Sequence, residues 1–232
     1  TLTRMMSPAT LNAFTGTTTL PLDLNGRQLI VLGMDQQRQA AIAPLIATVL
    51  HMLVVRNMSL ARTLPLVVSL DEVATLRLPS LVRWINEYRE RGLVLILGFQ
   101  NFAQLERTYN RPTARAIFGA CGTKVIFNPG EPESAQQFSA YLGEEELNIT
   151  QVSRSRGNGK TSINRTKQHR TRKLFEPSQF LKLPTGTATV LSPGLSTKRE
   201  SALPLKHAFR ISSQVSRLIT ASEQHWPEIQ QQ

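Results

Sequence analysis

Three polar side chains stand at the ends of two short apolar runs. Asp71 and Glu72 follow the run Leu66 to Leu70, and Gln100 follows the run Leu93 to Phe99. An aspartate in such a position can orient Mg²⁺ and its water ligands, and a neighbouring glutamate can take a proton from a water that attacks a γ-phosphate. A glutamine amide can hydrogen-bond both a phosphate oxygen and that water. These residue types therefore indicate phosphoryl-transfer chemistry.

The elements that carry these residues predict how they come together. Each apolar run is too short to span a membrane and suits a strand that is buried on both faces of a parallel sheet. Apolar residues recur at helical spacing between the runs, so Pro79 to about Arg91 is expected to form an amphipathic helix that Gly92 ends. Strand, helix and strand form a right-handed unit whose parallel strands end at one edge of the sheet. The amide of Gln100 is therefore expected beside the two carboxylates.

An apolar strand that ends in Asp-Glu matches the Walker B element of P-loop ATPases. Two simpler interpretations stay open at this point. Asp71 and Glu72 can belong to the start of an ordinary helix, where the helix dipole favours acidic side chains. Gln100 can be the residue that starts the following helix.

Several separated motifs resemble the C-terminal half of the motor domain of conjugative coupling proteins, the TraD/TraG-type ATPases of type IV secretion. The resemblance covers about Leu20 to Pro193 and rests on four stretches in the same order: LPLVVSLDEVATLRLPSL, YRERGLVLILGFQNFAQLERTYNR, CGTKVIF and ESAQQFSAYLGEEE. It implies an α/β fold, a RecA-like P-loop NTPase sheet with flanking helices. It also implies ATP and Mg²⁺ as cofactors.

The resemblance assigns a role to each candidate residue. Asp71 would bind nucleotide-associated Mg²⁺ through water, Glu72 would activate the attacking water, and Gln100 would sense the γ-phosphate. Arg89 matches the arginine that hexameric motors supply to the nucleotide of a neighbouring subunit, where it stabilises charge on the transferring phosphoryl group. Arg91 is the alternative for that role. Both arginines can also be solvated residues at a helix end, where positive charge complements the dipole.

The chain departs from the family pattern because it has no Walker A sequence. A P-loop requires G-x-x-x-x-G-K-[ST] after an apolar strand. In Gly157 to Thr161 the first glycine would have to stand at position 154, which is an arginine, so this segment is predicted to be a turn. The sheet is therefore expected to be incomplete, with its Walker A half upstream of Thr1. The membrane anchor and the inserted all-α domain that the resemblance implies are expected to be missing too. The chain alone is expected to be inactive.

A basic segment lies between residues 153 and 173. It contains no acidic residue and has a turn signal at its centre, so we expect a protruding hairpin or a mobile loop. Such a segment attracts phosphodiester backbones without reading sequence, although a merely solvated basic loop is the alternative. Because no aromatic residue is interleaved, base stacking is not supported. The candidate DNA-binding residues are Arg154, Arg156, Lys160, Arg165, Lys167, Arg170, Arg172 and Lys173.

The composition of the chain indicates what class of protein it belongs to. The chain has 232 residues, 41% of them hydrophobic, a formal net charge of +11 and a single cysteine, which suits a globular domain without an intrachain disulfide. Ile42 to Val55 is predicted to be a core helix that is shorter than a membrane span. Arg27 to Leu32 is predicted to be a buried strand, and Ala221 to Gln232 a frayed tail.

The predicted organisation has three parts: an irregular lead-in (residues 1–25), the distal part of a RecA-like core (26–194) with the basic excursion (153–173), and an extension (195–232). The resemblance implies the distal part of a coupling ATPase that moves single-stranded DNA and a relaxase into a type IV secretion channel. The intact protein would be a hexamer at the cytoplasmic face of the bacterial inner membrane, and this chain itself would be soluble. An FtsK/HerA-like DNA translocase and a truncated, non-catalytic basic DNA-binding or interaction module are the alternatives.

Overall fold

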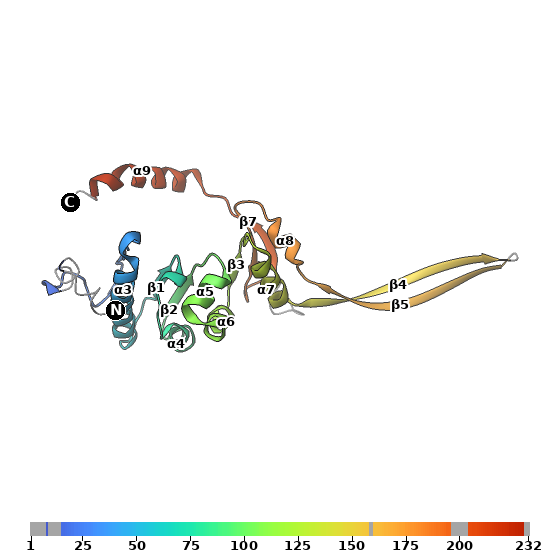
Figure 1. Ribbon diagram of the computed structural model, residues 1–232, viewed down its shortest axis with the longest axis horizontal. Helices are drawn as coiled ribbons and strands as arrows, with labels where there is room; N and C mark the ends of the chain where they lie inside the picture. The colour runs from blue at the N-terminus through green and yellow to red at the C-terminus, as the bar shows by residue number, and fades with distance from the viewer. Residues whose placement is uncertain (1–7, 9–14, 158–159, 196–203, 230–232) are drawn as a thin grey trace. The chain divides into compact units, whose positions relative to one another are not determined.

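The computed structural model describes residue 8 and residues 15–157, 160–195 and 204–229 (Figure 1). The chain divides into two compact units, which are unit 1 (residues 1–121) and unit 2 (residues 122–232). Both contain helices and strands, as an α/β fold requires.

Unit 1 is built around two parallel strands. β1 (Leu66–Leu70) and β2 (Leu93–Leu97) pair in register along their whole length. The connection contains the short 3₁₀ helix η2 (Val73–Thr75) and α4 (Leu81–Glu87), which is shorter than the predicted helix. The predicted strand, helix and parallel strand are therefore confirmed.

Only one face of this sheet is covered in the part of the chain that the structure describes. Along β1, Leu66, Val68 and Leu70 are buried, whereas Val67 is 54% exposed. On β2, Ile96 is 55% exposed. The prediction of strands buried on both faces is therefore wrong for the described residues, because a strand's second face is buried only when another layer packs on it.

The predicted buried strand Arg27 to Leu32 is also wrong. These residues form no strand with any described segment, and the side chains of Leu29 and Val31 are 88% and 78% exposed. An apolar run becomes a strand only where a neighbouring strand offers backbone hydrogen bonds.

α3 (Gln39–Met58) follows the 3₁₀ helix η1 (Gln36–Arg38) and packs one side into the core of unit 1 through Val54 and Met58. The expectation of a core helix is thus confirmed, but the helix has 20 residues, more than predicted. It is long and apolar enough to cross a membrane, with a mean hydropathy of 1.6, and 33% of that stretch is buried inside the protein.

Two helices follow β2. α5 (Phe102–Tyr109) and α6 (Arg111–Ala120) are separated by Asn110, whose φ of 61° ends the first helix. The Asn110 side chain also caps α6, accepting a hydrogen bond from the Thr113 amide at 3.0 Å. Burial raises the pKa of Tyr109, and its hydroxyl donates to the Leu76 carbonyl, which ties α5 to the segment after η2.

Unit 2 contains an antiparallel sheet with the strand order β3-β6-β7. Its elements, apart from the hairpin and the last helix, are β3 (Lys124–Ile126), α7 (Pro132–Leu142), α8 (Pro177–Leu181), β6 (Thr187–Leu191) and β7 (Leu205–Ala208). α7 and α8 meet through Phe138 and Phe180, whose ring centroids are 5.8 Å apart. Burial of these aromatic rings supplies much of the core of this unit.

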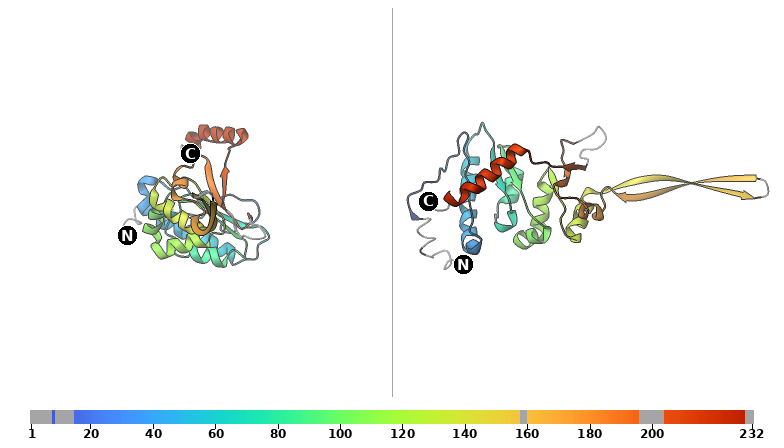
Figure 2. Two further views of the ribbon diagram at one scale, coloured as in Figure 1. Left: turned by 90° about the vertical axis from the view of Figure 1, so that its right-hand side faces the viewer. Right: turned by 90° about the horizontal axis from the view of Figure 1, so that it is seen from above.

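A long hairpin extends from unit 2. β4 (Glu144–Gly157) pairs with β5 (Lys160–Lys173) at every position of both strands, and the hairpin reaches far beyond the rest of the unit (Figures 1 and 2). The hairpin alternative for the basic segment is therefore confirmed, with Gly157 at the last pair before the turn. It begins at Glu144, nine residues before the basic segment that the sequence singled out.

α9 (Ser213–Ile229) corrects the prediction of a frayed tail for residues 221–229, which are helical. Val215, Leu218, Ile219 and Trp226 recur at helical spacing and remain exposed. This periodicity was the signal for a helix that the sequence-based prediction missed.

A buried amide holds the lead-in segment against α3. Asn57 is fully buried, and its Oδ1 accepts hydrogen bonds from the Leu24 amide at 2.8 Å and from Arg62 at 3.1 Å. Its Nδ2 donates to the Leu22 carbonyl at 2.9 Å. Nearby, Arg56 forms an exposed pair with Asp23, with nitrogen to oxygen distances of 2.6 and 2.9 Å.

Replacing Asn57 by alanine should destabilise unit 1 far more than replacing Arg56 by alanine. The first change leaves the partly buried backbone groups of Leu22 and Leu24 without their partner, which costs about 1 to 3 kcal/mol. The second removes an ion pair that solvent screens. Urea unfolding of both variants measures the difference, and equal losses of stability would contradict the assignment of Asn57 as the anchor.

Candidate functional site

The C-terminal ends of β1 and β2 are joined by two backbone hydrogen bonds. The Gly98 amide donates to the Leu70 carbonyl, and the Val73 amide donates to the Gly98 carbonyl, both at 2.8 Å. Asp71 and Glu72 lie on the backbone between these bonds. A Cβ atom at position 98 would overlap the carbonyl oxygen of Asp71, so only glycine permits this close approach.

The two carboxylates at this edge have different surroundings. Asp71 is exposed, whereas Glu72 is half-buried. The Oε1 atom of Glu72 is buried and has no hydrogen-bond partner among the described residues. A buried carboxylate oxygen without a partner is costly, and such atoms occur where a water or an ion is bound in the functional state. Glu72 thus has a free acceptor for a water, and Asp71 an accessible one for hydrated Mg²⁺.

Gln100 lies in the loop between β2 and α5, at the same edge of the sheet. The helix-start role that the sequence left open for it belongs to the next residue, because Asn101 Oδ1 accepts a hydrogen bond from the Gln104 amide at 2.9 Å. Gln100 is exposed, two residues beyond the glycine that bonds to β1. Its amide is therefore not used to cap the helix.

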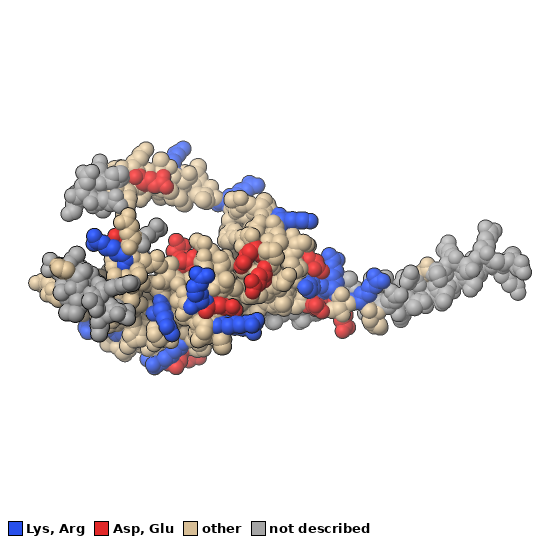
Figure 3. All heavy atoms as spheres, viewed as in Figure 1, with Lys and Arg blue, Asp and Glu red and all other residues tan. Residues whose placement is uncertain are grey.

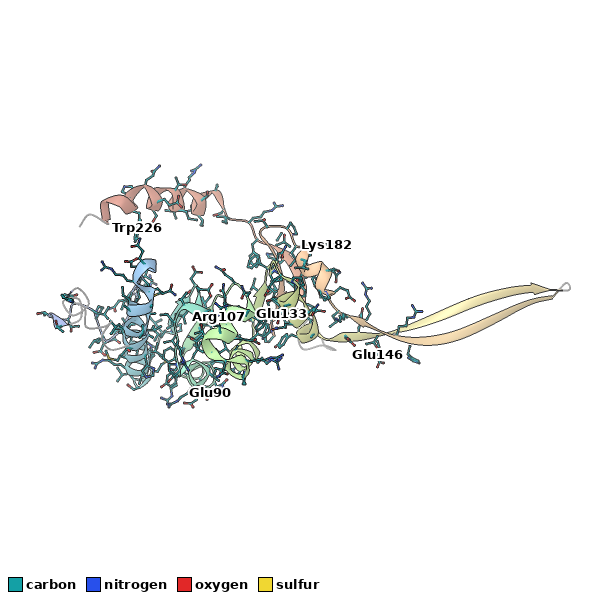
Figure 4. All side chains as sticks on the ribbon, viewed as in Figure 1. Glu90, Arg107, Glu133, Glu146, Lys182 and Trp226 are labelled. Carbon is teal, nitrogen blue, oxygen red and sulfur yellow. The ribbon has the colours of Figure 1, made fainter. Side chains whose placement is uncertain are left out.

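Arg89 lies at the opposite edge of the sheet. It stands in the turn after α4, where the Gly92 amide donates to the Arg89 carbonyl at 3.1 Å just before β2 begins. Glu90, its neighbour in sequence, is labelled at this edge in Figure 4. A five-residue strand spans roughly 16 Å, and this length separates Arg89 from Gln100.

The two candidate arginines differ in their contacts. Arg91 donates to the Met58 carbonyl at 3.3 Å, and its guanidinium carbon lies 5.8 Å from the centre of the Tyr88 ring. Arg89 is exposed and contacts no acidic side chain among the residues that the structure describes. Arg91 is therefore held against unit 1, whereas the Arg89 guanidinium is available to another molecule.

The described residues provide carboxylate and amide groups but no phosphate cradle. Gly157 and Lys160 form the last pair of the β4–β5 hairpin, so the segment from Gly157 to Thr161 is not a loop between a strand and a helix. Two hollows of about 570 and 650 Å³ occur in unit 1. The first is lined by Arg62, Glu90, Arg91 and their neighbours, and the second by α3 and the segment around Arg77. Neither is lined by Asp71, Glu72 or Gln100.

The base of the hairpin carries both signs of charge. Arg172 and Lys173 pair in register with Glu145 and Glu144, and Arg170 pairs with Leu147. Figure 3 shows acidic and basic side chains close together there, and Figure 4 labels Glu146 at the same place. The side chains of the other five candidate residues, Arg154, Arg156, Lys160, Arg165 and Lys167, lie outside the described set, although their backbone register is defined.

Comparison with known proteins identifies similar sequences. A family model described as the TraM recognition site of TraD and TraG matches residues 65–185. The chain is 28% identical over 127 residues to the probable conjugal transfer protein TraG of Sinorhizobium fredii, covering 54% of this chain and 20% of that protein. It is 34% identical over 77 residues to the coupling protein TraD of Escherichia coli K12, covering 33% and 11%. The chain thus matches a fifth or less of these relatives.

Solved structures show the same fold. The unbound bacterial conjugative coupling protein TrwBdeltaN70 superposes with a TM-score of 0.60 and 22% identity, over 77% of this chain and 39% of that one. The plasmid coupling protein TrwB in complex with ADP and Mg²⁺ gives a TM-score of 0.58 and 22% identity over the same shares. The chain therefore has the fold of part of a RecA-like P-loop NTPase.

A methyl group at Gly98 should disrupt the meeting of β1 and β2. Gly98→Ala places a Cβ against the Asp71 carbonyl, and the required backbone shift should cost about 1 to 3 kcal/mol of unfolding free energy. Gly119→Ala is the matched control, because a Cβ there meets nothing within 4 Å and alanine favours the helix by about 0.5 to 1 kcal/mol. Urea unfolding should show a lower free energy of unfolding for Gly98→Ala and a higher one for Gly119→Ala, each relative to the unchanged protein. A Gly98→Ala variant as stable as the unchanged protein would refute the close approach.

Proposed function

The chain belongs to the family of the conjugative coupling proteins TraD and TraG, and on that premise we propose that the intact protein is an ATP-hydrolysing DNA-transfer motor. It would move single-stranded DNA, with its relaxase, into a type IV secretion channel. The observation that supports the proposal is that Asp71, Glu72 and Gln100 follow the carboxyl ends of two paired parallel strands, with a buried Glu72 oxygen that has no partner among the described residues.

In the proposed reaction Glu72 accepts the proton of the attacking water. Its Oε1 atom is buried and has no hydrogen-bond partner among the described residues, so it can accept a hydrogen bond from that water. The Gln100 amide donates to a γ-phosphate oxygen and orients the same water. ATP would supply the phosphoryl group, and Mg²⁺ would offset its negative charge.

Asp71 fits a Mg²⁺ ion that is bound as in other nucleotide sites, by few protein ligands. Mg²⁺ usually takes one or two carboxylates together with waters and phosphate oxygens, and Asp71 offers one exposed carboxylate. The described residues contain no cluster of three or more metal-ligating side chains, so nucleotide phosphates would complete the coordination. The backbone amides that cradle the phosphates would come from another part of the protein.

We assign Arg89 to the nucleotide of a neighbouring subunit. It lies a full strand length from the Asp71 and Glu72 edge, so it cannot reach a nucleotide bound there in its own subunit. Arg89 is exposed and makes no ion pair within the described residues, so its side chain is not fixed against unit 1 by an acidic residue. This arrangement requires an oligomer, which we propose to be a hexamer.

The partners and location follow from the same proposal. The family model is described by recognition of TraM, which supports a relaxosome-type partner for residues 65–185. The basic hairpin residues would contact DNA phosphates, so binding should weaken steeply with salt. The motor would act at the cytoplasmic face of the bacterial inner membrane.

Two other functions remain distinguishable by experiment. An FtsK/HerA-like translocase would use the same carboxylates and amide but would not require a relaxase. A non-catalytic basic DNA-binding or interaction module is favoured by one observation, that the described residues form no phosphate cradle. ATPase assays of this chain and of an upstream-extended protein separate the classes, and we expect activity only in the second.

Glu72→Gln should lower ATP hydrolysis by the extended protein by about 100-fold or more, because the amide cannot accept the proton. Glu87→Gln is the matched control, since Glu87 forms an exposed pair with Arg83 at 2.7 Å, remote from the strand ends. Steady-state phosphate release measures both variants. Full activity of Glu72→Gln would disprove its role as the base.

Arg89→Ala should lower ATP hydrolysis by about 1,000-fold, whereas Arg91→Ala should mainly reduce stability. A mixture of Arg89→Ala and Glu72→Gln subunits tests action between subunits. An intact Glu72 then receives Arg89 from its neighbour, so part of the activity should return. If the mixture stays as inactive as its components, Arg89 does not act in trans.

A further inference from the structure

A hollow of about 650 Å³ lies in unit 1 between α3 and the segment that follows Glu72. One wall is the side of α3 that carries Ala40, Ala43 and Ala47, and the other wall is formed by residues 74–80. We call this space the α3 hollow. The small side chains of the helix leave it open, and its volume lies within the range of about 300 to 1,000 Å³ that is usual for binding sites.

The wall formed by residues 74–80 is held in place by side chains of α5. Thr108 Oγ1 donates to the Ala74 carbonyl at 2.7 Å, and the Tyr109 hydroxyl donates to the Leu76 carbonyl. The Leu78 amide donates to the same tyrosine oxygen at 3.2 Å. The hollow is therefore formed before a partner binds, so binding needs little additional ordering of the chain.

The threonine hydroxyl groups of the lining already donate their hydrogens within the protein. Thr48 Oγ1 donates to the Pro44 carbonyl at 2.8 Å. Thr75 Oγ1 donates to the Glu72 carbonyl at 2.7 Å. Thr108 also lines the hollow, and its hydroxyl is engaged in the same way. Because a sugar or a nucleotide needs several free donors to fix its position, this lining suits an apolar group better.

A histidine ring forms part of the lining of the α3 hollow. The ring of His51 stacks on Trp84, with the ring centroids 5.6 Å apart and an angle of 25° between the planes. Trp84 is only 1% exposed, so the histidine ring rests on the packed core of unit 1. A planar ring that is supported in this way offers contact area to an aromatic side chain.

Arg77 gives the α3 hollow a positive charge. No acidic side chain of the described residues lines the hollow, whereas Arg77 does. Arg77 is exposed and makes no ion pair with a described acidic residue. A guanidinium can donate two parallel hydrogen bonds to one carboxylate, and the net charge of +11 attracts acidic partners to the chain. The hollow therefore complements an apolar side chain that stands next to a carboxylate.

We propose that the α3 hollow is a docking site for a protein segment that carries an aromatic or large aliphatic side chain next to an acidic residue. The apolar side chain fills the space between α3 and residues 74–80 and contacts His51, while the carboxylate pairs with Arg77. Aromatic side chains in pockets and arginines carry much of the binding energy at protein interfaces. A small metabolite would need more convergent polar groups than this lining provides.

The test uses ¹H–¹⁵N NMR spectra of the 232-residue chain, in which each of the two tryptophans gives an indole N–H signal. The Trp226→Phe variant distinguishes the two signals. The probe is the acetylated and amidated peptide Gly-Glu-Phe-Leu-Gly. We expect a saturable shift of the Trp84 signal and none of the Trp226 signal, because Trp226 belongs to unit 2. The same peptide with Gln in place of Glu should bind about tenfold more weakly.

Arg77→Gln should weaken binding of the glutamate peptide by about tenfold, because the pair between guanidinium and carboxylate is lost. Arg115→Gln is the matched control, since Arg115 is an exposed arginine of α6 that does not line the hollow. We expect little change in the affinity of this control. Thr48→Phe fills the hollow from α3 and should abolish the saturable shift. Circular dichroism checks that the three variants keep the fold.

Four results would overturn the docking site. The first is a Trp84 signal that shows no saturable shift. The second is equal binding of the glutamate and glutamine peptides, and the third is an equal loss of affinity in Arg77→Gln and Arg115→Gln, which would show unselective attraction. The fourth is binding of 4-phenylbutyrate as tightly as the peptide, which would assign the hollow to a small aromatic acid. Because Glu72 does not line the hollow, ATP hydrolysis by the proposed motor is tested separately.

Discussion

The in-register parallel pairing of β1 with β2, completed by the backbone bonds of Gly98, is the constraint on which the rest of unit 1 depends. It fixes where each strand ends and therefore which polar residues share an edge. Because the approach is too close for a side chain at position 98, the backbone of Asp71 and Glu72 is held against the end of β2. Asp71, Glu72 and Gln100 then follow the carboxyl ends of neighbouring parallel strands, which is the usual ligand edge of an α/β sheet.

The pairing of β1 with β2 also puts Asp71 and Glu72 at one end of the strands and Arg89 at the other. A right-handed unit of strand, helix and strand returns the chain to the edge where it began, so the turn before β2 lies opposite the carboxylates. Arg89 in that turn is exposed, whereas Arg91 is bound to the Met58 carbonyl. One short structural unit thus carries the two acidic residues and Arg89 at opposite ends of its strands, which is the arrangement that the proposed site between subunits requires.

Unit 2 combines a small aromatic core with a long, positively charged hairpin. Its helices bury Phe138 and Phe180 against each other, while residues 153–173 of the hairpin carry eight basic residues and no acidic one. A segment with an excess of positive charge attracts anionic partners, and a two-stranded ribbon is at best marginally stable by itself. At the base of the hairpin, Glu144 and Glu145 pair in register with Lys173 and Arg172.

The sequence alone determined the features that depend on local pattern. It predicted β1, β2, the helix between them and the helix that includes Ile42 to Val55, because apolar runs, helical periodicity and glycine stops act over a few residues. It also located the acids and the amide at strand ends. Tertiary structure decided everything that needs a partner distant in sequence. Arg27 to Leu32 has the composition of a strand but pairs with no described strand, and Asn101 rather than Gln100 caps α5 because of its backbone geometry. Likewise only the strand register, set by hydrogen bonds across the hairpin, pairs Arg172 and Lys173 with Glu145 and Glu144 at its base.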